Sequence, residues 1–331
     1  MTSIYLVTGA AGHLGGVITQ SLLARGESVR VLVLPNEKAV LPDGAEVFEG
    51  DVRDIDSLRG FFTASGYDKV IVLHCAGIVT IQSGLGKKVI DVNAGGTANI
   101  IRLCMEKRID KLVYVSSVHA IKEQPEGTII AETDIFKARD VAGIYAKTKA
   151  CATAMALKAA RHGLDVSVVH PSGIIGPQDT SGSNHLTKMI KDFCGGRLPA
   201  GLKGGYDFVD VRDVADGVIA CAQRGKSGEC YILSGHYATI KELFALLEKV
   251  SGAKAPQTYL PLPAAMLFAL GAELTAKIKQ KRPLYTAYSI YTLGTNARFS
   301  HEKASKELGY SPRPLEETLR DTVAWINENQ T

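Results

Sequence analysis

Residues 4–15 read Ile-Tyr-Leu-Val-Thr-Gly-Ala-Ala-Gly-His-Leu-Gly, and this stretch decides the fold. An apolar run suited to a fully buried strand comes first, and apolar residues at helical spacing follow the glycines. In a strand–turn–helix unit, Gly9 permits a tight turn, Gly12 lets the backbone approach a pyrophosphate, and Gly15 lets the helix pack close to the strand. The free N–H groups of the first helical turn would then face the phosphates. A tight turn without a ligand is the alternative, which the position between strand and helix disfavours.

The composition excludes several classes of protein. Of 331 residues, 46% are apolar and 22% charged, which is ordinary for a soluble globular chain with one large core and a smaller lobe. A net charge of +4, without a basic run interleaved with aromatics, argues against nucleic acid as a partner. The longest apolar window, 260–272, contains two prolines and is too short to span a bilayer. Because the chain begins with a strand and not with a signal peptide, we expect a cytoplasmic protein.

Six cysteines are widely spaced and form no Cys-x-x-Cys pair. This spacing favours buried thiols in a reducing compartment over a disulfide framework or a metal site. The six are Cys75, Cys104, Cys151, Cys194, Cys221 and Cys230.

Strand and helix patterns alternate along the first half of the chain. After the first strand, further strands are expected at residues 29–34, 45–49, 70–74, 112–115 and 166–170. The alternation predicts an α/β fold with a Rossmann-type, doubly wound parallel sheet, whose ligands bind at the carboxyl ends of the strands. Beyond residue 170 the alternation loosens. We therefore expect a dinucleotide-binding domain at 1–170 and a smaller α+β substrate lobe at 171–331, interleaved with the first domain and without a clean linker.

Helices are predicted between and after these strands. One, at 87–107, carries Asn93 inside an apolar stripe and two glycines just beyond it. A buried Asn needs a partner, and a mid-helix glycine costs about 1 kcal/mol relative to alanine, so close packing or a kink should compensate. Residues 118–142 and 195–205 are expected to be irregular. The other helices are expected at 56–64, 143–161, 184–194, 214–223, 239–251 (with a capping box at its start), 264–279, 300–308 and 314–327.

The second strand ends in Val33-Leu34-Pro35. An acid at this point selects NAD and an arginine accepts NADP; neither is present, so the preference between NAD and NADP stays open. Asn36 or Lys38 is a candidate to reach the ribose or a phosphate, with a solvated loop as the alternative. Asp51 stands at the carboxyl end of the third strand, where ligands of open sheets bind.

The central strands also end in small or hydroxyl residues. Ala76 and Gly77 would allow close approach of a ligand, whereas the preceding His74 is interpreted as structural. Ser116 and Ser117 end the fifth strand, where hydroxyls are well placed for chemistry.

Tyr145 and Lys149 lie four residues apart and share one face of a predicted helix. An ammonium beside a phenol favours the phenolate and lowers the tyrosine pKa. Such a pair often occurs by chance, but here the glycine turn and the serines converge on the same cleft.

Together these motifs resemble the extended short-chain dehydrogenase/reductase (NAD-dependent epimerase/dehydratase) superfamily over nearly the whole chain. The matches, in chain order, are Thr-Gly-x-x-Gly-x-x-Gly at 8–15, Asp51-Val52, Asn-x-x-Gly-Thr-x-Asn at 93–99, Ser116-Ser117, Tyr-x-x-x-Lys at 145–149, His-Pro-Ser-Gly-Ile-Ile-Gly-Pro at 170–177 and Phe-Val-Asp-Val-Arg-Asp-Val-Ala at 208–215.

The resemblance implies an enzyme with NAD or NADP as cofactor and no metal. It implies that Tyr145 is the acid/base, that Lys149 bonds the nicotinamide ribose and lowers the tyrosine pKa, and that Ser117, with Ser116 as the fallback, holds the substrate oxygen. Asn93 would support a water relay. The implied cofactor contacts are Gly9, Ala11, Gly12, His13, Leu14, Gly15, Leu34, Asp51, Val52, Ala76, Gly77, Asn93, Tyr145, Lys149, Pro171, Ser172, Gly173 and Ile174.

The implied reaction is hydride transfer. In reduction, Ser117 and Tyr145 donate hydrogen bonds to a carbonyl, hydride arrives from the nicotinamide, and Tyr145 delivers the proton; oxidation is the reverse. A tyrosine at its ordinary pKa of about 10 is a poor base at neutral pH. Lys149 and the cationic oxidised nicotinamide are expected to supply the shift.

Two subclasses compete for the substrate. Nucleotide-sugar epimerases and dehydratases usually carry an arginine just before Asp-Phe-Val, which grips a diphosphate. Tyr206 stands there in this chain, with Lys203 or Arg197 as stand-in cations. The resemblance to dihydroflavonol reductases and 3β-hydroxysteroid dehydrogenases favours an apolar, steroid- or flavonoid-like secondary alcohol or ketone. The apolar stretch 259–274 is a candidate lid for it, or simply core of the second lobe.

Ser117, His119 and Tyr206 are the tentative substrate contacts; for His119, a plain loop histidine is the alternative. The expected partners are a small molecule and a second copy of the chain, paired through helices 87–107 and 143–161 as in similar enzymes. A non-catalytic NAD(P)-binding regulator is the remaining possibility, which the complete catalytic set disfavours.

Overall fold

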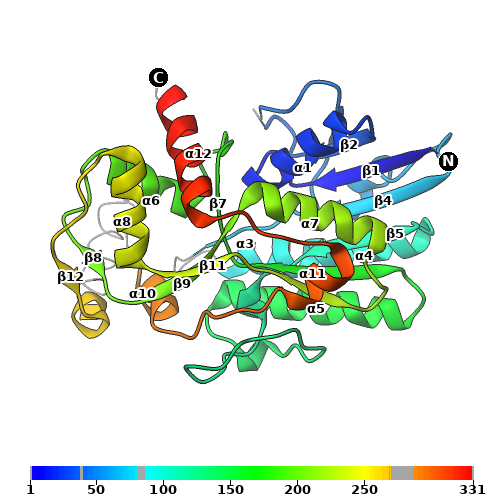
Figure 1. The fold of residues 1–331 in the computed structure, drawn as a ribbon. Coiled ribbons are helices and arrows are strands. Elements are labelled where there is room, and N and C mark those ends of the chain that lie inside the picture. The colour runs from blue at the N-terminus through cyan, green and yellow to red at the C-terminus, as the bar shows by residue number, and fades with distance from the viewer. Residues whose placement is uncertain (1, 38–39, 81–85, 268, 270–285, 330–331) are drawn as a thin grey trace.

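A seven-stranded parallel sheet forms the centre of the computed structural model, which describes residues 2–37, 40–80, 86–267, 269 and 286–329 (Figure 1). In sheet order the strands are β10 (Cys230–Leu233), β6 (Val166–Pro171), β5 (Lys111–Val115), β4 (Lys69–His74), β1 (Ser3–Thr8), β2 (Ser28–Val33) and β3 (Glu46–Glu49). All neighbours pair in parallel. The chain order reverses between β1 and β4, and a crevice for a dinucleotide forms at such a reversal. The predicted Rossmann-type sheet is confirmed.

Strand β1 is buried on both faces, as its continuous apolar run predicted. Ile4 and Leu6 point into one core, whereas Tyr5 and Val7 point into the other. Successive side chains of a strand alternate between faces, so one short segment holds both helical layers.

Helices cover both faces of the sheet (Figure 1). The layer containing α1 (His13–Ala24), α7 (Val211–Arg224) and α11 (Glu302–Leu308) packs on Tyr5 and Val7. On the opposite face lie α4 (Thr97–Glu106) and α5 (Ile144–Arg161). Because α7, β10 and α11 come from beyond residue 170, the later chain returns to the first sheet.

The predicted helix at 87–107 is helical along its length but changes type in the middle. It consists of α3 (Gly86–Ile90), a π-helical segment (Asp91–Gly96) and α4. A Cβ on Gly96 would lie 2.7 Å from Cγ2 of Val52. The glycine therefore permits close packing, and the π-segment is the local distortion that the mid-helix glycines predicted.

The prediction of a helix at 56–64 is wrong in the helix length. Helix α2 (Ile55–Leu58) has a single turn. The apolar residues Phe61 and Phe62 that suggested a longer helix are buried in the core from a turn, and a Cβ on Gly60 would lie 2.8 Å from the ring of Phe48. Tertiary packing here outweighs the periodic pattern.

A second group of elements forms most of the remaining chain. Its small sheet contains β7 (Gly173–Ile175), β9 (Gly205–Asp210) and β11 (His236–Thr239) in the order β11-β9-β7. A third core packs these strands against three helices, α6 (His185–Cys194), α8 (Ile240–Ser251) and α12 (Leu315–Glu328). The short strands β8 (Gly201–Leu202) and β12 (Tyr259–Leu260) pair beside α10 (Ala287–Leu293).

Two predictions about this region have opposite outcomes. The capping box is confirmed, since Thr239 and Glu242 bond each other's backbone N–H at the start of α8. The irregular stretch predicted at 195–205 is wrong in part, because β8 and the first residue of β9 lie in it. The irregular stretch at 118–142 contains two single-turn 3₁₀ helices, Val118–Ala120 and Ala138–Asp140.

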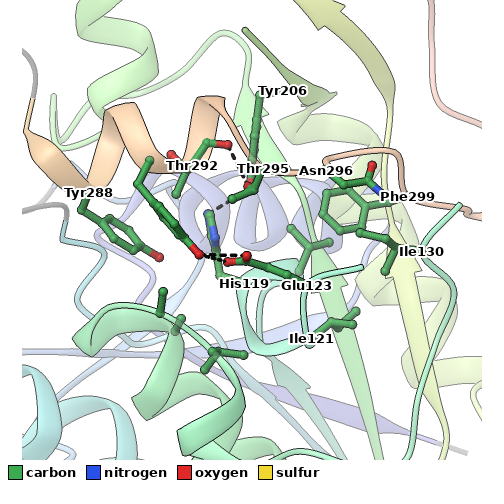
Figure 2. A pocket seen from close by; sticks show the side chains of 15 residues that line it. His119, Ile121, Glu123, Ile130, Tyr206, Tyr288, Thr292, Thr295, Asn296 and Phe299 are labelled. Atoms are coloured by element: carbon green, nitrogen blue, oxygen red, sulfur yellow. Dashed lines mark hydrogen bonds between the residues drawn. The ribbon is translucent and has the colours of Figure 1, made fainter. Parts of the chain in front are cut away.

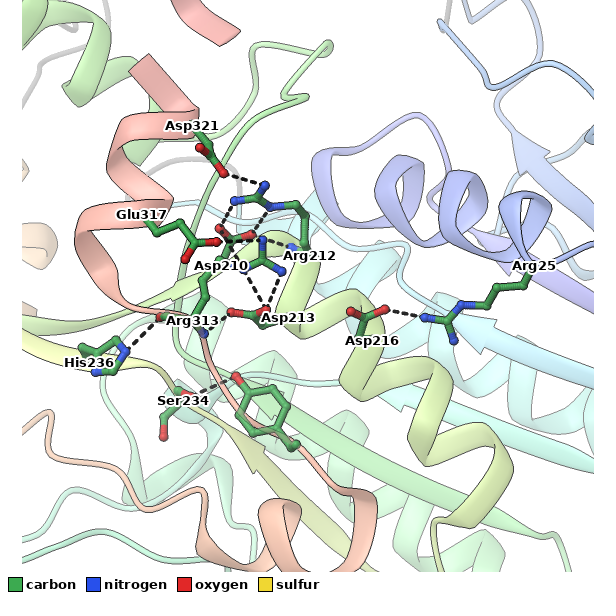
Figure 3. A network of polar contacts seen from close by, with 11 residues as sticks. Arg25, Asp210, Arg212, Asp213, Asp216, Ser234, His236, Arg313, Glu317 and Asp321 are labelled. Atoms are coloured by element: carbon green, nitrogen blue, oxygen red, sulfur yellow. Dashed lines mark hydrogen bonds and ion pairs between the residues drawn. The ribbon is translucent and has the colours of Figure 1, made fainter. Parts of the chain in front are cut away.

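Buried charges fix α12 to the turn between β9 and α7 (Figure 3). Arg212 pairs with Asp210 and Asp321, both at 2.7 Å, and Arg313 pairs with Asp213 at 2.8 Å. Asp210 is fully buried and accepts two hydrogen bonds from the Arg212 side chain. Breaking such a pair leaves an uncompensated buried charge, so the network holds the C-terminal helix in one place.

The candidate lid is described only in part. Leu260, Leu262 and Met266 pack in a small cluster with Ile290, which agrees with core, whereas Leu267 is 74% exposed. Residue 268 and residues 270–285, with most of the helix predicted at 264–279, lie outside the described residues.

The cysteines form no disulfide within the described part of the chain. Three are buried, but Cys151 is exposed on α5, so the prediction of buried thiols fails there. In the ranges that the structure describes, no helix has both the length and the apolar character needed to cross a membrane.

Candidate active site

The glycine turn joins β1 to α1 at the carboxyl edge of the large sheet. Gly9 has a φ of +76°, a conformation that favours glycine, and a Cβ on Gly15 would lie 2.1 Å from the Gly9 carbonyl oxygen. The turn therefore needs both glycines. At Gly12 a Cβ would meet only that same carbonyl, at 3.3 Å, so this side of the turn is free for a ligand's close approach. The first-turn N–H groups of α1 and this cradle fit a dinucleotide pyrophosphate.

His13, predicted among the cofactor contacts, uses its side chain within the protein. Its Nε2 bonds the Pro177 carbonyl at 2.8 Å and its Nδ1 lies 3.1 Å from the Asn184 amide nitrogen. Burial lowers the pKa of His13, so the ring is neutral when it makes these bonds. The histidine thus links the glycine turn to the start of α6, a contact that the sequence did not reveal. Its neighbours Ala11 and Leu14 are both half-buried.

At the adenosine end, Leu34 is exposed and Asp51 pairs with Arg53. The Arg53 side chain donates hydrogen bonds to both carboxylate oxygens, and this holds the pKa of Asp51 below its usual value. Sequence reasoning missed Arg53, although an arginine two residues after a strand-end acid was a signal. Asn36 has a φ of +61° in an exposed loop, and Lys38 lies outside the described residues.

The Asn93 side chain holds the loop after β4. Its Oδ1 accepts from the Ile78 N–H at 2.7 Å, and its Nδ2 donates to the Ile78 carbonyl at 3.0 Å and to the Thr148 hydroxyl at 3.2 Å. The predicted partner of this buried amide therefore exists. The same loop contains Ala76 and Gly77, and a Cβ on Gly77 would lie 3.4 Å from the Lys149 ammonium nitrogen.

His74 is structural, as predicted. Its ring bonds the Thr8 hydroxyl at 2.8 Å and the Thr97 hydroxyl at 3.0 Å, and it is fully buried. It thereby ties β1 and the start of α4 to β4.

Two of the three candidate catalytic side chains, Ser117 and Tyr145, meet just beyond the end of β5, and Lys149 donates a hydrogen bond to the Val115 carbonyl at the end of that strand. A hydrogen bond with Ser117 lowers the pKa of Tyr145, but burial outweighs it and raises that pKa to about 12. Lys149 is not among the groups that lower it, which differs from the sequence-based expectation. The protein alone therefore keeps Tyr145 protonated at neutral pH. Ser116 points away, because its hydroxyl bonds Thr153 at 2.7 Å in the core, so Ser117 is the better placed of the two serines.

The segment after β6 is held by a buried carboxylate. The Ser172 hydroxyl donates a hydrogen bond to Asp207, which also accepts one from the Gly235 N–H at 2.8 Å. Burial raises the pKa of Asp207 to about 6. A Cβ on Gly173 would lie 2.8 Å from the Asp207 carbonyl oxygen, so the predicted cofactor segment Pro171–Ile174 packs closely on β9.

Aromatic side chains from distant segments line a cavity next to Tyr145 (Figure 2). His119 and Tyr206 stack with ring centroids 5.7 Å apart, and Nε2 of His119 lies 2.8 Å from the Tyr206 hydroxyl. The ring of His119 meets that of Tyr145 edge-on at 6.0 Å. Burial lowers the pKa of His119 to about 4 and raises that of Tyr206 well above its ordinary value, so both are neutral at pH 7.

Helix α10 supplies two further aromatic side chains to the lining, Tyr288 and Tyr291, which sequence reasoning missed. Tyr288 tilts against His119 at 6.2 Å, and Tyr291 bonds Glu123 at 2.7 and 2.8 Å. Their spacing of three residues, typical of one helix face, was the available signal. The rings leave an open volume of about 30 Å³, so they largely fill the cavity themselves.

In the ranges that the structure describes, nowhere do three His, Cys, Asp or Glu side chains gather as a candidate metal site.

Comparison with known proteins covers nearly the full length. The family model "NAD dependent epimerase/dehydratase family" matches residues 5–234. Sterol demethylase protein B from Methylococcus capsulatus is 31% identical over 327 residues, 98% of each chain. A putative dihydroflavonol 4-reductase from Synechocystis is 28% identical and covers 99% of this chain and 96% of its own length. The crystal structure of gox2253 superposes with a TM-score of 0.85 at 31% identity, over 99% of this chain and 98% of that one.

Proposed function

The chain belongs to the NAD dependent epimerase/dehydratase family, and from this premise we propose that it interconverts a secondary alcohol and a ketone on a small apolar, steroid- or flavonoid-like substrate. As a member of this family, the chain is an enzyme that uses a nicotinamide dinucleotide as its cofactor. The observation that carries the proposal is the position of Tyr145 and Ser117 beside a cavity lined by aromatic side chains, with Lys149 one helical turn after Tyr145.

In this proposal Tyr145 is the acid/base and Ser117 positions the substrate oxygen. Because burial keeps Tyr145 protonated in the protein alone, it is ready to donate its proton to a developing alkoxide. Ser117, bonded to Tyr145, donates to the same oxygen. When bound, the nicotinamide supplies or accepts the hydride. Oxidation requires the phenolate, so the bound complex must lower the Tyr145 pKa, and the Lys149 ammonium favours that shift.

The cofactor is proposed to lie along the carboxyl edge of the sheet. The glycine turn would hold the pyrophosphate and Asp51 and Val52 the adenine, with Leu34 nearby. Asn93 would support the loop that faces the ribose. The remaining proposed contacts are Ala11, His13, Leu14, Ala76, Gly77, Lys149 and Pro171 to Ile174.

The cavity lining supports an apolar substrate. His119 and Tyr206 are neutral at pH 7, and an anion beside them would lose its hydration without gaining a positive partner. Relatives named for a sterol and for dihydroflavonol agree with a flat ring system, which could lie against the stacked aromatic side chains.

A nucleotide-sugar epimerase or dehydratase is the second candidate, because the family model is named for epimerases and dehydratases. The side chains weigh against it. Tyr206, in place of an arginine, bonds His119, and Arg197 is tied to Asp192 at 2.8 Å. Lys203 is exposed and is the remaining candidate cation among those three positions.

We also propose that residues 1–170 make most of the cofactor contacts and that 171–331 contribute part of the substrate wall. The second part of this proposal follows from the lining, since Tyr206 and Tyr288 both come after residue 170. Two copies are proposed to pair through 87–107 and 143–161, where Met105 is 44% exposed and Cys151 is exposed.

The test is nicotinamide absorbance during turnover, with NAD and NADP in separate assays. The panel contains 3β-hydroxysteroids, flavonoid-like and simple secondary alcohols, and UDP-, GDP- and dTDP-sugars. Stoichiometric build-up of reduced cofactor with an apolar alcohol is expected and would identify the preferred cofactor. A changed sugar nucleotide without net reduction would establish the second candidate instead.

A further inference from the structure

Lys149 is the most enclosed cation near the cavity. Its side chain lies within α5 and against the sheet, and the residue is 4% exposed. A buried ammonium is costly unless other groups replace the water it loses. The identity of those groups decides whether the charge survives at neutral pH.

Titratable groups reach Lys149 from every element packed around it, and none of them brings a negative charge at pH 7. Burial lowers the pKa of His74 to about 3 and that of His170 to about 4, and raises that of Cys75 to about 12. Tyr145, on the same helix, has its pKa raised to about 12. The pKa of Tyr114 is raised too. All five are therefore neutral, and Lys149 has no carboxylate partner among the described residues that the structure places in contact with it.

Two groups do stabilise the ammonium. Lys149 donates one hydrogen bond to the Val115 carbonyl at 2.8 Å. Its Nζ also lies 5.0 Å from the centre of the Tyr114 ring, within the range of a cation–π contact. A desolvated cation gains more from an aromatic face than an exposed one does.

Tyr114 contributes its ring, and not its hydroxyl, to this contact. The ring is fully buried and stacks on His74 with centroids 5.7 Å apart. The hydroxyl has Thr97 and Ser116 as polar neighbours, but these two hydroxyls already bond the Asn93 carbonyl and Thr153. The hydroxyl of Tyr114 therefore gains little from them, and the aromatic ring is the part of the side chain that contacts Lys149.

We propose that the ring of Tyr114 is a positioning group that holds the Lys149 ammonium, charged and in place, by a cation–π interaction. This inference rests on the proposed function only for its catalytic consequence, because the effect on Lys149 can be measured without turnover. Since the Val115 carbonyl belongs to the backbone, Tyr114 is the side chain through which the charge on Lys149 can be tuned.

The sharpest test keeps the packing and changes only the ring electrons. Tyr114→Phe is the parent variant, and one, two or three fluorines on that Phe weaken the negative ring face step by step. The Lys149 pKa is read by NMR titration of protein labelled with ¹³C at the lysine Cε, with the signal assigned by its loss in Lys149→Met. Burial sets this pKa at about 8 in the wild type.

Tyr114→Phe should leave the Lys149 pKa unchanged, because the ring face remains. The trifluorinated form should lower it by about one unit, with the intermediate forms between. Tyr114→Leu should lower it as well, but with a cavity that reduces stability. A Lys149 pKa that is the same throughout the fluorinated series would overturn the proposal.

The kinetic readout follows in the oxidation direction. As the Lys149 pKa falls, less ammonium is present to stabilise the Tyr145 phenolate, so the rising limb of kcat/KM against pH should move to higher pH in the same order. A graded Lys149 pKa with no turnover on any substrate would uphold Tyr114's role and reject the proposed function. A graded pKa with an unmoved rate profile would show that Lys149 does not set the Tyr145 pKa.

Discussion

The site has two walls that differ in origin and in how they are held. The polar wall, with Ser117, Tyr145 and Lys149, lies just beyond β5 and on α5, and its side chains bond backbone and one another. The aromatic wall, with Tyr206 and Tyr288, comes from β9 and α10, and its rings stack mainly on His119. In our proposal the reacting groups thus belong to the first sheet and the helix packed on it, whereas substrate contact falls to aromatic side chains from later in the chain. Changes in the polar wall should affect kcat, and changes in the aromatic wall should affect KM.

The largest effect is expected for Tyr145→Phe. The variant keeps the ring and its edge contact with His119 but loses the transferable proton. General acid–base groups contribute about 10²–10⁴-fold, so kcat should fall by about a thousandfold. Cofactor affinity, measured by fluorescence titration of the reduced cofactor, should stay within about twofold. Turnover that survives this change would remove Tyr145 from the acid/base role.

Asp207→Asn tests the buried carboxylate next to Tyr206 in the sequence, which accepts the Ser172 hydroxyl of the proposed cofactor segment. Its pKa is raised from an ordinary 3.8 to about 6 by burial. Between these pH values the unfolded chain has released the proton and the folded protein keeps it, so stability falls as pH rises. The loss amounts to at most about 3 kcal/mol.

Asp207→Asn keeps an oxygen to accept the same bonds, so urea denaturation should show that this fall between pH 4 and pH 6 is absent. The exposed Asp43→Asn is the control and should parallel the wild type. Equal slopes in all three proteins would mean that Asp207 titrates normally.

Gly143→Ala tests the contact between the two walls, because Gly143 lies two residues before Tyr145 at the start of α5. A Cβ there would lie 2.4 Å from the ring of Tyr288, and Gly143 has a φ of +83°. Gly127→Ala is the matched control, because Gly127 has a φ of +85° and nothing within 4 Å of its Cβ position. Both variants place a side chain at a similar positive φ, and only Gly143→Ala displaces the ring.

Overpacking costs about 1–3 kcal/mol, so kcat/KM should fall about thirtyfold further in Gly143→Ala than in Gly127→Ala. The difference should lie in KM, with cofactor affinity unchanged. If the two variants behave alike, Tyr288 does not shape the substrate site.

The polar wall was predictable from sequence and the aromatic wall only in part. Tyr145 and Lys149 lie four residues apart on one helix, where spacing fixes that they share a face, and Ser117 directly follows a strand of the sheet. Tyr288 contacts His119 across about 170 residues of chain, and no local pattern specifies such a contact. The same reason explains His13, whose partners Pro177 and Asn184 come from an irregular segment, and Phe61, which fills the core from a turn where helical spacing suggested a helix.

The smallest effect, and the one that separates the walls most finely, is expected for Tyr206→Phe. It keeps the ring stacked on His119 at 5.7 Å and removes only the hydroxyl bonded to Nε2. One such hydrogen bond contributes about 0.5–1.5 kcal/mol, so KM for the preferred apolar substrate should rise about fivefold with kcat nearly unchanged. Tyr291→Phe is the matched control: it also loses hydrogen bonds, to Glu123, but at a position that is 39% exposed, so KM should change less than twofold. Equal effects of the two variants would make the His119–Tyr206 bond unimportant for binding. A loss of kcat in Tyr206→Phe as large as that in Tyr145→Phe would place the tyrosine in the chemistry itself, and the division between a reacting wall and a recognising wall would then be wrong.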